Sequence, residues 1–434
     1  MTGRAEAVTG SRLLRVCLVS GEYPPDEGGV ADYTLLLARA LAGAGHPVDV
    51  VTARRPGAAA VVPELDAASG PAEARAPDDP TPRVNAHRVI PGWGWRSLPA
   101  LRRATAVLRP DVVHVQYQAA AYGLRAPVHL APYWVGMGRA VRLVVTYHDL
   151  RPPYLFPKAG RLRRSALLAL GRQADLALAT NEDDWRALAT RLPRERLGLI
   201  PIGSNVADQP PPEFQRARFR AAAGIGADEA LVGYFGFLNE SKGARALLEA
   251  LALLRAAGRR VTLVMIGGAT GTSDPTNAAY LAVFEAELQQ RSLAPAVRWT
   301  GHLPPGGVSA WLRACDVAAL PYRDGASYRR GSLLAALEHG LPVVTTTPAP
   351  PAAGGPEPPP GAVPPPPRDG VNAVLVPPDD GAALARAIQR VLTDAALSER
   401  LSRGAKDLAA AFHWDAIARA HLERYRALVA GDDG

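Results

Sequence analysis

The chain repeats one pattern, in which a short apolar run is followed by a turn and then by a stretch with helical periodicity. Continuous apolar runs of this length are typical of parallel strands buried on both faces. In the first half the runs are Leu14 to Ser20, Val48 to Thr52, Asp111 to Tyr117, Leu143 to His148 and Asp175 to Thr180. Strands alternating with helices predict a doubly wound α/β sheet, whose ligands gather at the carboxyl ends of the strands.

The pattern stops once and then starts again. Residues 203–212 (GSNVADQPPP) are polar and proline-rich, as in a linker between domains. The later runs are Leu231 to Phe235, Val261 to Ile266, Val297 to Thr300, Val317 to Pro321 and Pro342 to Thr346. With 434 residues and 48% hydrophobic composition, the chain is long and apolar enough to fill two cores. We therefore predict two Rossmann-like domains facing across a cleft, at 1–205 and 213–413, with a last helix at about 414–434 packing back on the first.

Composition excludes few partners. The net charge of +8 is spread over the whole chain, so it does not choose among nucleic acid, anionic lipid and a phosphorylated substrate; we expect no nucleic-acid partner. Cys17 and Cys315 lack partners at metal-ligand or redox spacing and are expected to be buried. The N-terminus has no apolar signal-peptide centre, and no stretch is long enough without charge to span a bilayer, so we expect a cytoplasmic protein.

Two features of the first half are candidates for a binding site. Gly28 and Gly29 stand just before a helix predicted to begin near Val30. Glycines there let the backbone approach a bound group, and a helix N-terminus offers N–H donors to an anion, although a plain structural turn has the same pattern. His148 ends a predicted strand at the ligand-binding edge, where a histidine bonded to local backbone is the alternative.

The second half carries cations at the same kind of edge. The turn FGFLNESKG places Lys242 just before a helix, where an ammonium suits a phosphate and where a solvated surface lysine is the alternative. Arg329, Arg330 and Gly331 precede a helix predicted from about Ser332 to His339. Two guanidinium groups and a helix N-terminus make a credible diphosphate cradle, unless the arginines only complement a surface.

The motifs GEYPPDEGGVADYT, TYHD, GFLNESKG, CDVAALPY through LEHGLPVVTT, DGVNAVLVPPDD and FHWDAIA, in this order, resemble the retaining glycosyltransferase family 4 of GT-B enzymes. The resemblance covers nearly the whole chain. It implies a nucleotide-sugar donor held mainly by the second domain, an acceptor on the first, and no metal ion or other cofactor. It also implies a front-side route in which the departing phosphate takes the acceptor's proton. No Asp-x-Asp triplet, the usual metal site of the other large glycosyltransferase fold, occurs in the chain.

The resemblance assigns roles residue by residue. Gly28 and Gly29 match the glycine-rich loop on the acceptor side of the family. His148 matches the histidine near the transferring sugar. Lys242 matches the lysine that contacts the donor's diphosphate. The site expected from the resemblance and the residues together adds the two arginines of the cradle, Gly331 and Ser332 as donor-binding groups.

The chain also departs from the family. Phe237 stands where the family usually has an arginine, and Ser327 and Ala335 stand where it has two glutamates, which contact the sugar and the ribose. An arginine of the cradle could supply the missing cation, because a diphosphate needs its charge neutralised rather than one position filled. Glu338, about one helical turn beyond Ala335, could reach a hydroxyl or be an exposed carboxylate at the helix end.

These departures leave three function classes open. The first is a retaining, metal-independent glycosyltransferase that acts on an unknown acceptor. The second is a non-catalytic relative that binds a carbohydrate or nucleotide, or acts as a scaffold, after losing the paired glutamates. The third, a nucleotide-sugar epimerase of the same architecture, is disfavoured because the chain lacks a set of carboxylate bases.

One segment raises the question of membranes. Trp93, Trp95, Arg96, Arg102 and Arg103 lie near the start of a predicted helix. Aromatic and basic side chains of this kind suit a lipid headgroup boundary, which would make the protein peripheral at the inner face of the membrane. In the alternative, the tryptophans pack against the sheet edge and the arginines are solvated.

Overall fold

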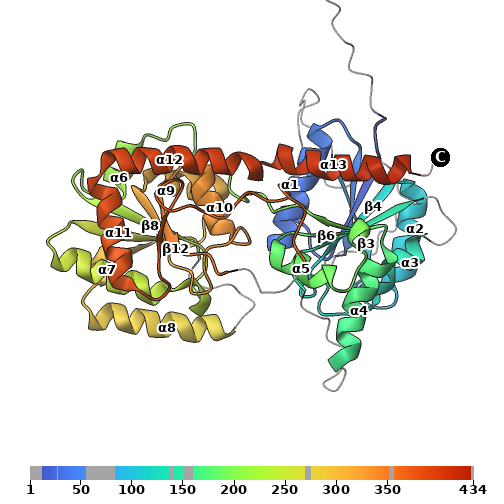
Figure 1. The fold of residues 1–434 in the computed structure, drawn as a ribbon, viewed down its shortest axis with the longest axis horizontal. Helices are drawn as coiled ribbons and strands as arrows, with labels where there is room; N and C mark the ends of the chain where they lie inside the picture. Colours follow the sequence, from blue (N-terminus) through green and yellow to red (C-terminus); the bar gives the residue numbers. More distant parts are fainter. Residues whose placement is uncertain are drawn as a thin grey trace, which may run out of the picture. The chain divides into compact units, whose positions relative to one another are not determined.

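The computed structural model describes residues 12–26, 28–54, 84–136, 141–150, 160–268, 275–350 and 356–431; the side chains of 160–164 and 275–278 lie outside the description. The chain divides into two compact units (Figure 1). Unit 1 comprises Met1–Ile200, Gly354–Pro360 and Trp414–Gly434, and unit 2 comprises Pro201–Ala353 and Gly361–His413.

Unit 1 is built on a parallel sheet of seven strands in the order β3-β2-β1-β4-β5-β6-β7. The chain reverses its direction of travel across the sheet between β1 and β4, which is the switch point where Rossmann folds bind ligands. The strands are β1 Val16–Ser20, β2 Val48–Ala53, β3 Val84–Ile90, β4 Val112–Tyr117, β5 Arg142–Tyr147, β6 Leu176–Ala179 and β7 Leu197–Leu199. The α-helices are α1 Gly29–Gly43, α2 Ser97–Leu108, α3 Ala131–Gly136, α4 Gly160–Gln173, α5 Glu182–Ala189 and α13 Trp414–Ala430.

Unit 2 has the same winding in a six-stranded parallel sheet of order β10-β9-β8-β11-β12-β13, with its switch point between β8 and β11. The strands are β8 Ala230–Phe235, β9 Val261–Ile266, β10 Val297–Trp299, β11 Val317–Leu320, β12 Val343–Thr346 and β13 Val374–Val376. The α-helices are α6 Arg216–Ala222, α7 Ala244–Ala256, α8 Pro275–Gln290, α9 Pro305–Ala314, α10 Gly331–Glu338, α11 Gly381–Thr393 and α12 Ala395–Ala409. The predicted α/β class with two doubly wound sheets is confirmed.

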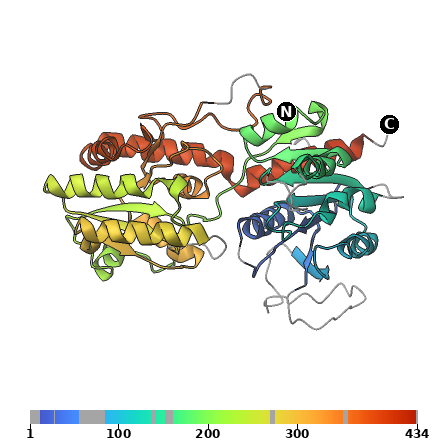
Figure 2. The ribbon, with the colours of Figure 1, turned by 90° about the horizontal axis from the view of Figure 1, so that it is seen from below.

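The sheet of unit 2 is covered on both faces, as its continuous apolar strands require (Figure 2). Along β8, Val232 and Tyr234 enter the core formed with α7 and α11, whereas Leu231 enters the core formed with α9 and α10. Alternate residues therefore bury into two separate cores. Cys315 lies in the second of them and Cys17 in the core of unit 1, both as free thiols, and burial raises the pKa of each.

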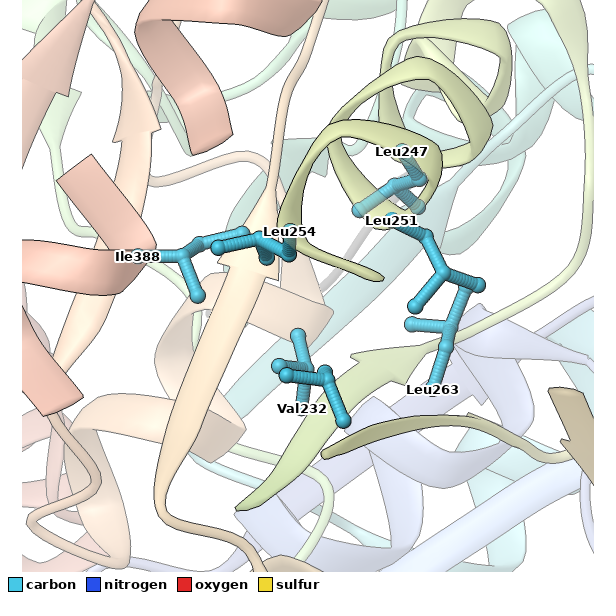
Figure 3. A pocket seen from close by; sticks show the side chains of 7 residues that line it. Val232, Leu247, Leu251, Leu254, Leu263 and Ile388 are labelled. Atoms are coloured by element: carbon cyan, nitrogen blue, oxygen red, sulfur yellow. The ribbon is translucent and has the colours of Figure 1, made fainter. Parts of the chain in front are cut away.

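A small void lies in the first core of unit 2, between α7, α11 and strands β8 and β9 (Figure 3). Its volume is about 10 Å³, and its lining is Val232, Leu247, Leu251, Leu254, Val261, Leu263 and Ile388. A space of this size is at the lower limit for one water molecule, and this lining offers water no polar partner. We interpret the void as a packing feature of the core.

None of the described helices combines the length and the apolar character needed to cross a membrane.

Candidate functional site

The cations of unit 2 lie at the carboxyl edge of its sheet, next to the switch point. The turn after β8 leads into the 3-10 helix η3, Glu240–Lys242, and the segment after β11 leads to α10. Strands β8 and β11 are adjacent in the sheet, so their following turns meet at one place. Lys242 and the N-terminus of α10 come from these two turns.

The sequence of the first turn explains why it places Lys242 there. The Asn239 side chain caps η3 by accepting a hydrogen bond from the Lys242 backbone N–H at 3.1 Å. Gly243 then adopts a φ of +67° and lies so close to β11 that an added Cβ would come within 1.8 Å of the Pro321 carbonyl oxygen. Only glycine fits both requirements. From the other side, Arg323 forms an ion pair with Glu240.

The Lys242 ammonium is packed against backbone and a second cation. A Cβ added to Gly236 would lie 2.7 Å from Lys242 Nζ and 4.0 Å from Ser332 Cβ, so the ammonium lies over this glycine and close to α10. Burial, and secondarily the Arg330 guanidinium, lower the pKa of Lys242 to about 8. Neighbouring like charges and desolvation lower the pKa of an amine, and an anionic ligand would relieve both effects.

Arg330 is fixed in place, whereas Arg329 is exposed. The Arg330 guanidinium pairs with the Asp324 carboxylate and lies 5.1 Å from the centre of the Tyr322 ring. The Tyr322 hydroxyl in turn lies 2.7 Å from the Ser332 hydroxyl, inside the first turn of α10. Tyr322 therefore links Arg330 to the start of the helix.

The N-terminus of α10 is open. The helix begins at Gly331 with Arg330 as its N-cap residue, which makes no side-chain capping hydrogen bond. A Cβ added to Gly331 would meet no atom within 4 Å. The Leu333 N–H donates to the Arg330 carbonyl oxygen at 2.9 Å, but the N–H groups before it have no intrahelical acceptor, so this helix N-terminus beside Lys242 and Arg330 is suited to a diphosphate.

The positions where the chain departs from the family lie in different environments from one another. Ala335 is fully buried in the core of unit 2. Phe237 is 46% exposed on the turn after β8. Glu338 lies at the carboxyl end of α10, roughly 10 Å of helix away from Gly331, and its carboxylate lies 3.3 Å from His413 Nε2. Glu338 is thus engaged away from the helix start, and it is half-buried rather than exposed.

The glycine pair of unit 1 has a different environment from the one predicted. The N-terminus of α1 already holds a carboxylate, because Glu22 Oε1 accepts a hydrogen bond from the Ala31 backbone N–H at 3.3 Å. A Cβ on Gly28 would come within 2.0 Å of that carboxylate, whereas a Cβ on Gly29 would meet nothing within 4 Å. At least one N–H donor of this helix end is therefore already used by the chain's own carboxylate, and the role of Gly28 and Gly29 in binding a substrate stays a prediction.

Arg88 on β3 holds the turn that carries Glu22. Its guanidinium donates hydrogen bonds to the carbonyl oxygens of Tyr23 at 2.7 Å and Pro24 at 2.9 Å, and pairs with Asp26 at 3.1 Å. It also donates to the Ala53 carbonyl oxygen at 3.2 Å, and a guanidinium shared among these acceptors fixes their geometry. The loop between β1 and α1 is therefore a built structure.

In the segment that holds Trp93, Trp95 and the nearby arginines, some side chains fit the packing interpretation and others fit the membrane interpretation. Trp93 is only 6% exposed, and its indole N–H donates to the Gly21 carbonyl oxygen at 3.1 Å. Trp95 is 70% exposed, and Arg96 and Arg103 are exposed as well. Trp93 is thus part of the fold, and of these two tryptophans only Trp95 is available on the surface.

His148 follows β5 directly, at the carboxyl edge of the unit 1 sheet. Its Nε2 lies 3.0 Å from Gln116 Oε1, and the Tyr33 ring packs edge-on against it with centroids 4.5 Å apart. Burial, with a smaller effect of His421, lowers the pKa of His148 to about 3. The imidazole is therefore neutral at physiological pH.

Sequence reasoning missed three side chains at these two edges. Glu22, Gln116 and Tyr322 contact the predicted residues Gly28, His148 and Ser332, respectively. Gln116 had a signal: it is a polar residue near the end of a largely apolar strand run, on a ligand-binding edge. Glu22 and Tyr322 had none, because their contacts depend on how separate turns fold together.

In the part of the chain that the structure describes, no three His, Cys, Asp or Glu side chains are placed to hold a metal ion together.

Comparisons with known proteins agree along the whole chain. Residues 27–208 match the family described as Glycosyltransferase Family 4, and residues 229–394 match Glycosyl transferases group 1. A D-inositol 3-phosphate glycosyltransferase of Acidothermus cellulolyticus is 30% identical over 93% of this chain and 87% of its own. A glycogen synthase of Mycobacterium tuberculosis is 27% identical over 96% of each chain.

Solved structures share the fold. A sucrose-phosphate synthase of Thermosynechococcus elongatus superimposes with a TM-score of 0.68 at 23% identity, covering 96% of this chain and 100% of that one. Anabaena Alr3699/HepE, solved in complex with UDP and glucose, gives a TM-score of 0.64 at 18% identity over 95% of this chain and 100% of its own. The two sheets, the motifs in their order and the relatives in sequence lead to one conclusion: this chain belongs to the GT-B glycosyltransferases of family 4 and is an enzyme of the glycosyltransferase type.

Proposed function

We propose that the enzyme transfers a sugar from a nucleoside diphosphate sugar to an acceptor hydroxyl with retention of the anomeric configuration and without a metal ion. The donor binds to unit 2 and the acceptor to unit 1. The observation that supports this proposal most is the cationic edge of unit 2, where Lys242, Arg330 and the open N-terminus of α10 lie together. Fixed cations and N–H dipoles at a leaving group need no reorganisation during the reaction.

The bonds that change are few. The bond between the anomeric carbon and the β-phosphate oxygen breaks, and the acceptor oxygen forms a new bond on the same face of the sugar. The acceptor's proton passes to the departing phosphate. Lys242 and Arg330 stabilise the charge that develops on the diphosphate, and His148, as a neutral imidazole, positions the reacting groups.

The cradle also replaces the arginine that is absent at Phe237. Arg330 lies close enough to Lys242 to lower its pKa, so the two cations act on one small volume. Both cations stand opposite the two negative charges of a nucleotide sugar's diphosphate, with Arg330 also paired to Asp324. The charge neutralisation that a divalent ion gives in other enzymes is thereby supplied by side chains.

The relatives suggest the first substrates to test. Because HepE was solved with UDP and with UDP-glucose, we propose a uridine diphosphate sugar as the first donor. The relatives named D-inositol 3-phosphate glycosyltransferase and glycogen synthase make a phosphorylated polyol and a glucan the first acceptors to try.

A thermal-shift screen with UDP, GDP, ADP and dTDP sugars tests the donor, since a ligand that binds only the folded state raises its stability. Turnover with the best donor is then measured with and without EDTA, and the anomer of the product is identified by NMR. We expect one nucleotide class to stabilise the protein, an unchanged rate in EDTA, and a retained configuration. Rescue of a lost rate by manganese or magnesium, or an inverted product, contradicts the proposed chemistry.

We also propose that the protein acts in the cytoplasm with peripheral contact to the membrane at the Trp95 surface. The exposed Trp95, Arg96 and Arg103 support this, while the burial of Trp93 reduces the area available. Co-sedimentation with vesicles containing anionic lipid checks the proposal. We expect binding that weakens with salt and with Trp95→Ser, and no binding at low salt would refute it.

A further inference from the structure

One face of the unit 1 sheet carries an unusual row of polar side chains at its switch point. His114 and Gln116 are two residues apart on β4 and share that face, and Thr146 on β5 pairs in register with Gln116. His148 follows Thr146 by two residues, which continues the row. His114 and Gln116 are fully buried.

The helices α1 and α13 supply polar groups to the same face. Tyr425 Oη of α13 lies 2.6 Å from His114 Nδ1, and the His421 ring of the same helix lies 5.5 Å from that of His114. From α1, Tyr33 packs on His148 and also on Trp414 of α13, with the latter centroids 5.2 Å apart. His148 is thus held between Tyr33 of α1 and Gln116 of β4, and it stays partly exposed.

The structure orients the Gln116 amide with Oε1 toward the His148 ring. In this orientation the oxygen can only accept a hydrogen bond, so a neutral His148 carries its hydrogen on Nε2, whereas the reversed amide would act as donor and place the hydrogen on Nδ1. Because the ring is neutral, Nδ1 then has a free lone pair. Fixing one nitrogen as donor defines the other as acceptor.

The Gln116 side chain destabilises the fold. A purely structural role therefore does not explain it, whereas a positioning role does. The Gln116 Nε2 atom is buried and has no hydrogen-bond partner in the described part of the chain. A buried amide N–H without a partner lowers the free energy of unfolding, a cost that an apolar side chain would not have. A residue that weakens the core yet contacts His148 at the sheet edge fits a functional purpose.

We infer that Gln116 is a positioning residue that holds His148 as the Nε2–H tautomer, so that Nδ1 serves as the hydrogen-bond acceptor for a sugar or acceptor hydroxyl. The inference rests on the proposed function for the identity of that hydroxyl. The tautomer itself does not depend on it.

The first test needs no substrate. In the full-length protein labelled with ¹⁵N-histidine, the His148 resonances are assigned by their loss in His148→Gln. We expect Nε2 to be protonated and Nδ1 unprotonated from pH 5 to pH 8. Protonation on Nδ1 overturns the inference whatever the enzyme's activity proves to be.

Two substitutions then separate orientation from charge. In Gln116→Leu the ring loses its acceptor, and we expect kcat to fall roughly 10- to 100-fold, with KM changed less than about 2-fold and thermal stability kept or raised. In Gln116→Glu the acceptor oxygen is kept, but the carboxylate charge favours protonation of the pair that it forms with His148. This variant should keep more activity than Gln116→Leu at high pH and lose it on acidification, with an acidic limb that the wild-type pH profile lacks.

The pH profile must be assigned to His148 among its neighbours. The titratable groups that face or adjoin it are His114 on β4, His421 and Tyr425 on α13, Tyr33 on α1, and the following Asp149. Burial lowers the pKa of His114 and His421 and raises that of both tyrosines. The NMR titration of His148 in Gln116→Glu must therefore follow the same midpoint as the new acidic limb.

Thr52→Val is the matched control. Thr52 Oγ1 is also a buried polar atom without a partner in the described residues, on β2 of the same sheet. We expect this change to leave the pH profile and the His148 tautomer as in the wild type. If Gln116→Leu behaves like Thr52→Val, or if Gln116→Glu keeps the wild-type profile and His148 titration, the positioning role is refuted.

Discussion

The two units each place a glycine at the start of a helix beside a sheet edge, but the two helix ends are in opposite states. At α1, the Glu22 carboxylate accepts from the Ala31 N–H, and Gly28 leaves room for it. At α10, the space over Gly331 is open and a lysine and an arginine lie nearby. One helix end carries its own anion, and the other is ready for an anion from outside.

The comparison teaches that a glycine before a helix does not by itself identify an anion site. The same backbone geometry serves internal capping when an acidic side chain lies within reach, and it serves ligand binding when the nearby side chains are cationic. The sign of the neighbouring charge decides between them. Unit 2 has the sign that a diphosphate needs.

The largest effect is expected for Lys242→Ala. Removing a cation from the leaving group while deleting no core volume should lower kcat by about 10²–10³-fold. The fold should be unchanged, as judged by circular dichroism and thermal unfolding. Lys406→Ala, at the other lysine that the structure describes, is exposed and should change kcat by less than about 2-fold. Near-normal turnover of Lys242→Ala with the correct donor would show that the open helix end is not the catalytic one.

Arg330→Ala should weaken nucleoside diphosphate binding by about 1.5–3 kcal/mol, the scale of a hydrogen bond to a charged group. Arg329→Ala is its matched control, because the neighbouring guanidinium is exposed and exposed charges contribute less than about 1 kcal/mol. Isothermal calorimetry with UDP, or with whichever nucleotide the screen selects, measures both. Equal losses in the two variants would mean that the cradle does not depend on the ordered arginine.

The pH dependence of nucleotide binding also tests whether the Lys242 ammonium contacts the diphosphate. Lys242 has a pKa of about 8 in the free protein, and a bound diphosphate favours its charged form. Affinity should therefore be steady below that pH and fall above it, by up to about tenfold per pH unit. In Lys242→Ala this fall should be absent, and in Arg330→Ala the midpoint should move to higher pH. A pH-independent affinity in the wild type would exclude an ammonium contact.

The smallest effects are expected for substitutions of the glycines at the two helix ends, measured as changes in the free energy of unfolding. Gly28→Ala should displace the Glu22 carboxylate and cost about 1 kcal/mol of the free energy of unfolding. Gly29→Ala, with open space around it, should be neutral or stabilise by up to about 1 kcal/mol, as should Gly331→Ala. Urea denaturation measures all three, and Gly331→Ala should alone weaken nucleotide binding. If Gly28→Ala and Gly29→Ala have equal stability, the carboxylate is not held at α1.

Most strands that the sequence predicted are buried along their length, because a continuous apolar run is visible without knowing the partners; the partly buried edge strand β10 was predicted as well. Three strands escaped prediction. β3 (VNAHRVI) is only partly buried and mixes polar with apolar residues, while β7 and β13 have three residues each. All three lie at a sheet edge. Since β7 is fully buried and β13 largely so, their short length rather than their exposure hid them.

The candidate site likewise contains residues that the sequence could predict and residues that it could not. Lys242 and Arg330 were predictable because each follows a recognisable strand and precedes a helix, so topology alone brings them to one edge. The carboxylate of Glu22 at α1 was not, since no sequence pattern tells which acidic residue of a loop turns back onto a helix. The pairing of Gln116 with His148 depends on the register of β4 against β5, which only the folded sheet defines.

The last helix of the chain has a consequence for biosynthesis. Because α13 packs on α1 and its Tyr425 reaches His114, the first unit lacks one wall until residues near 430 have left the ribosome. Unit 2 is complete in sequence earlier, although its synthesis begins later. Domains of most proteins fold in the order in which they emerge; here the unit that starts first is finished last, and a fragment ending before Trp414 would leave His114 without its contacts to Tyr425 and His421.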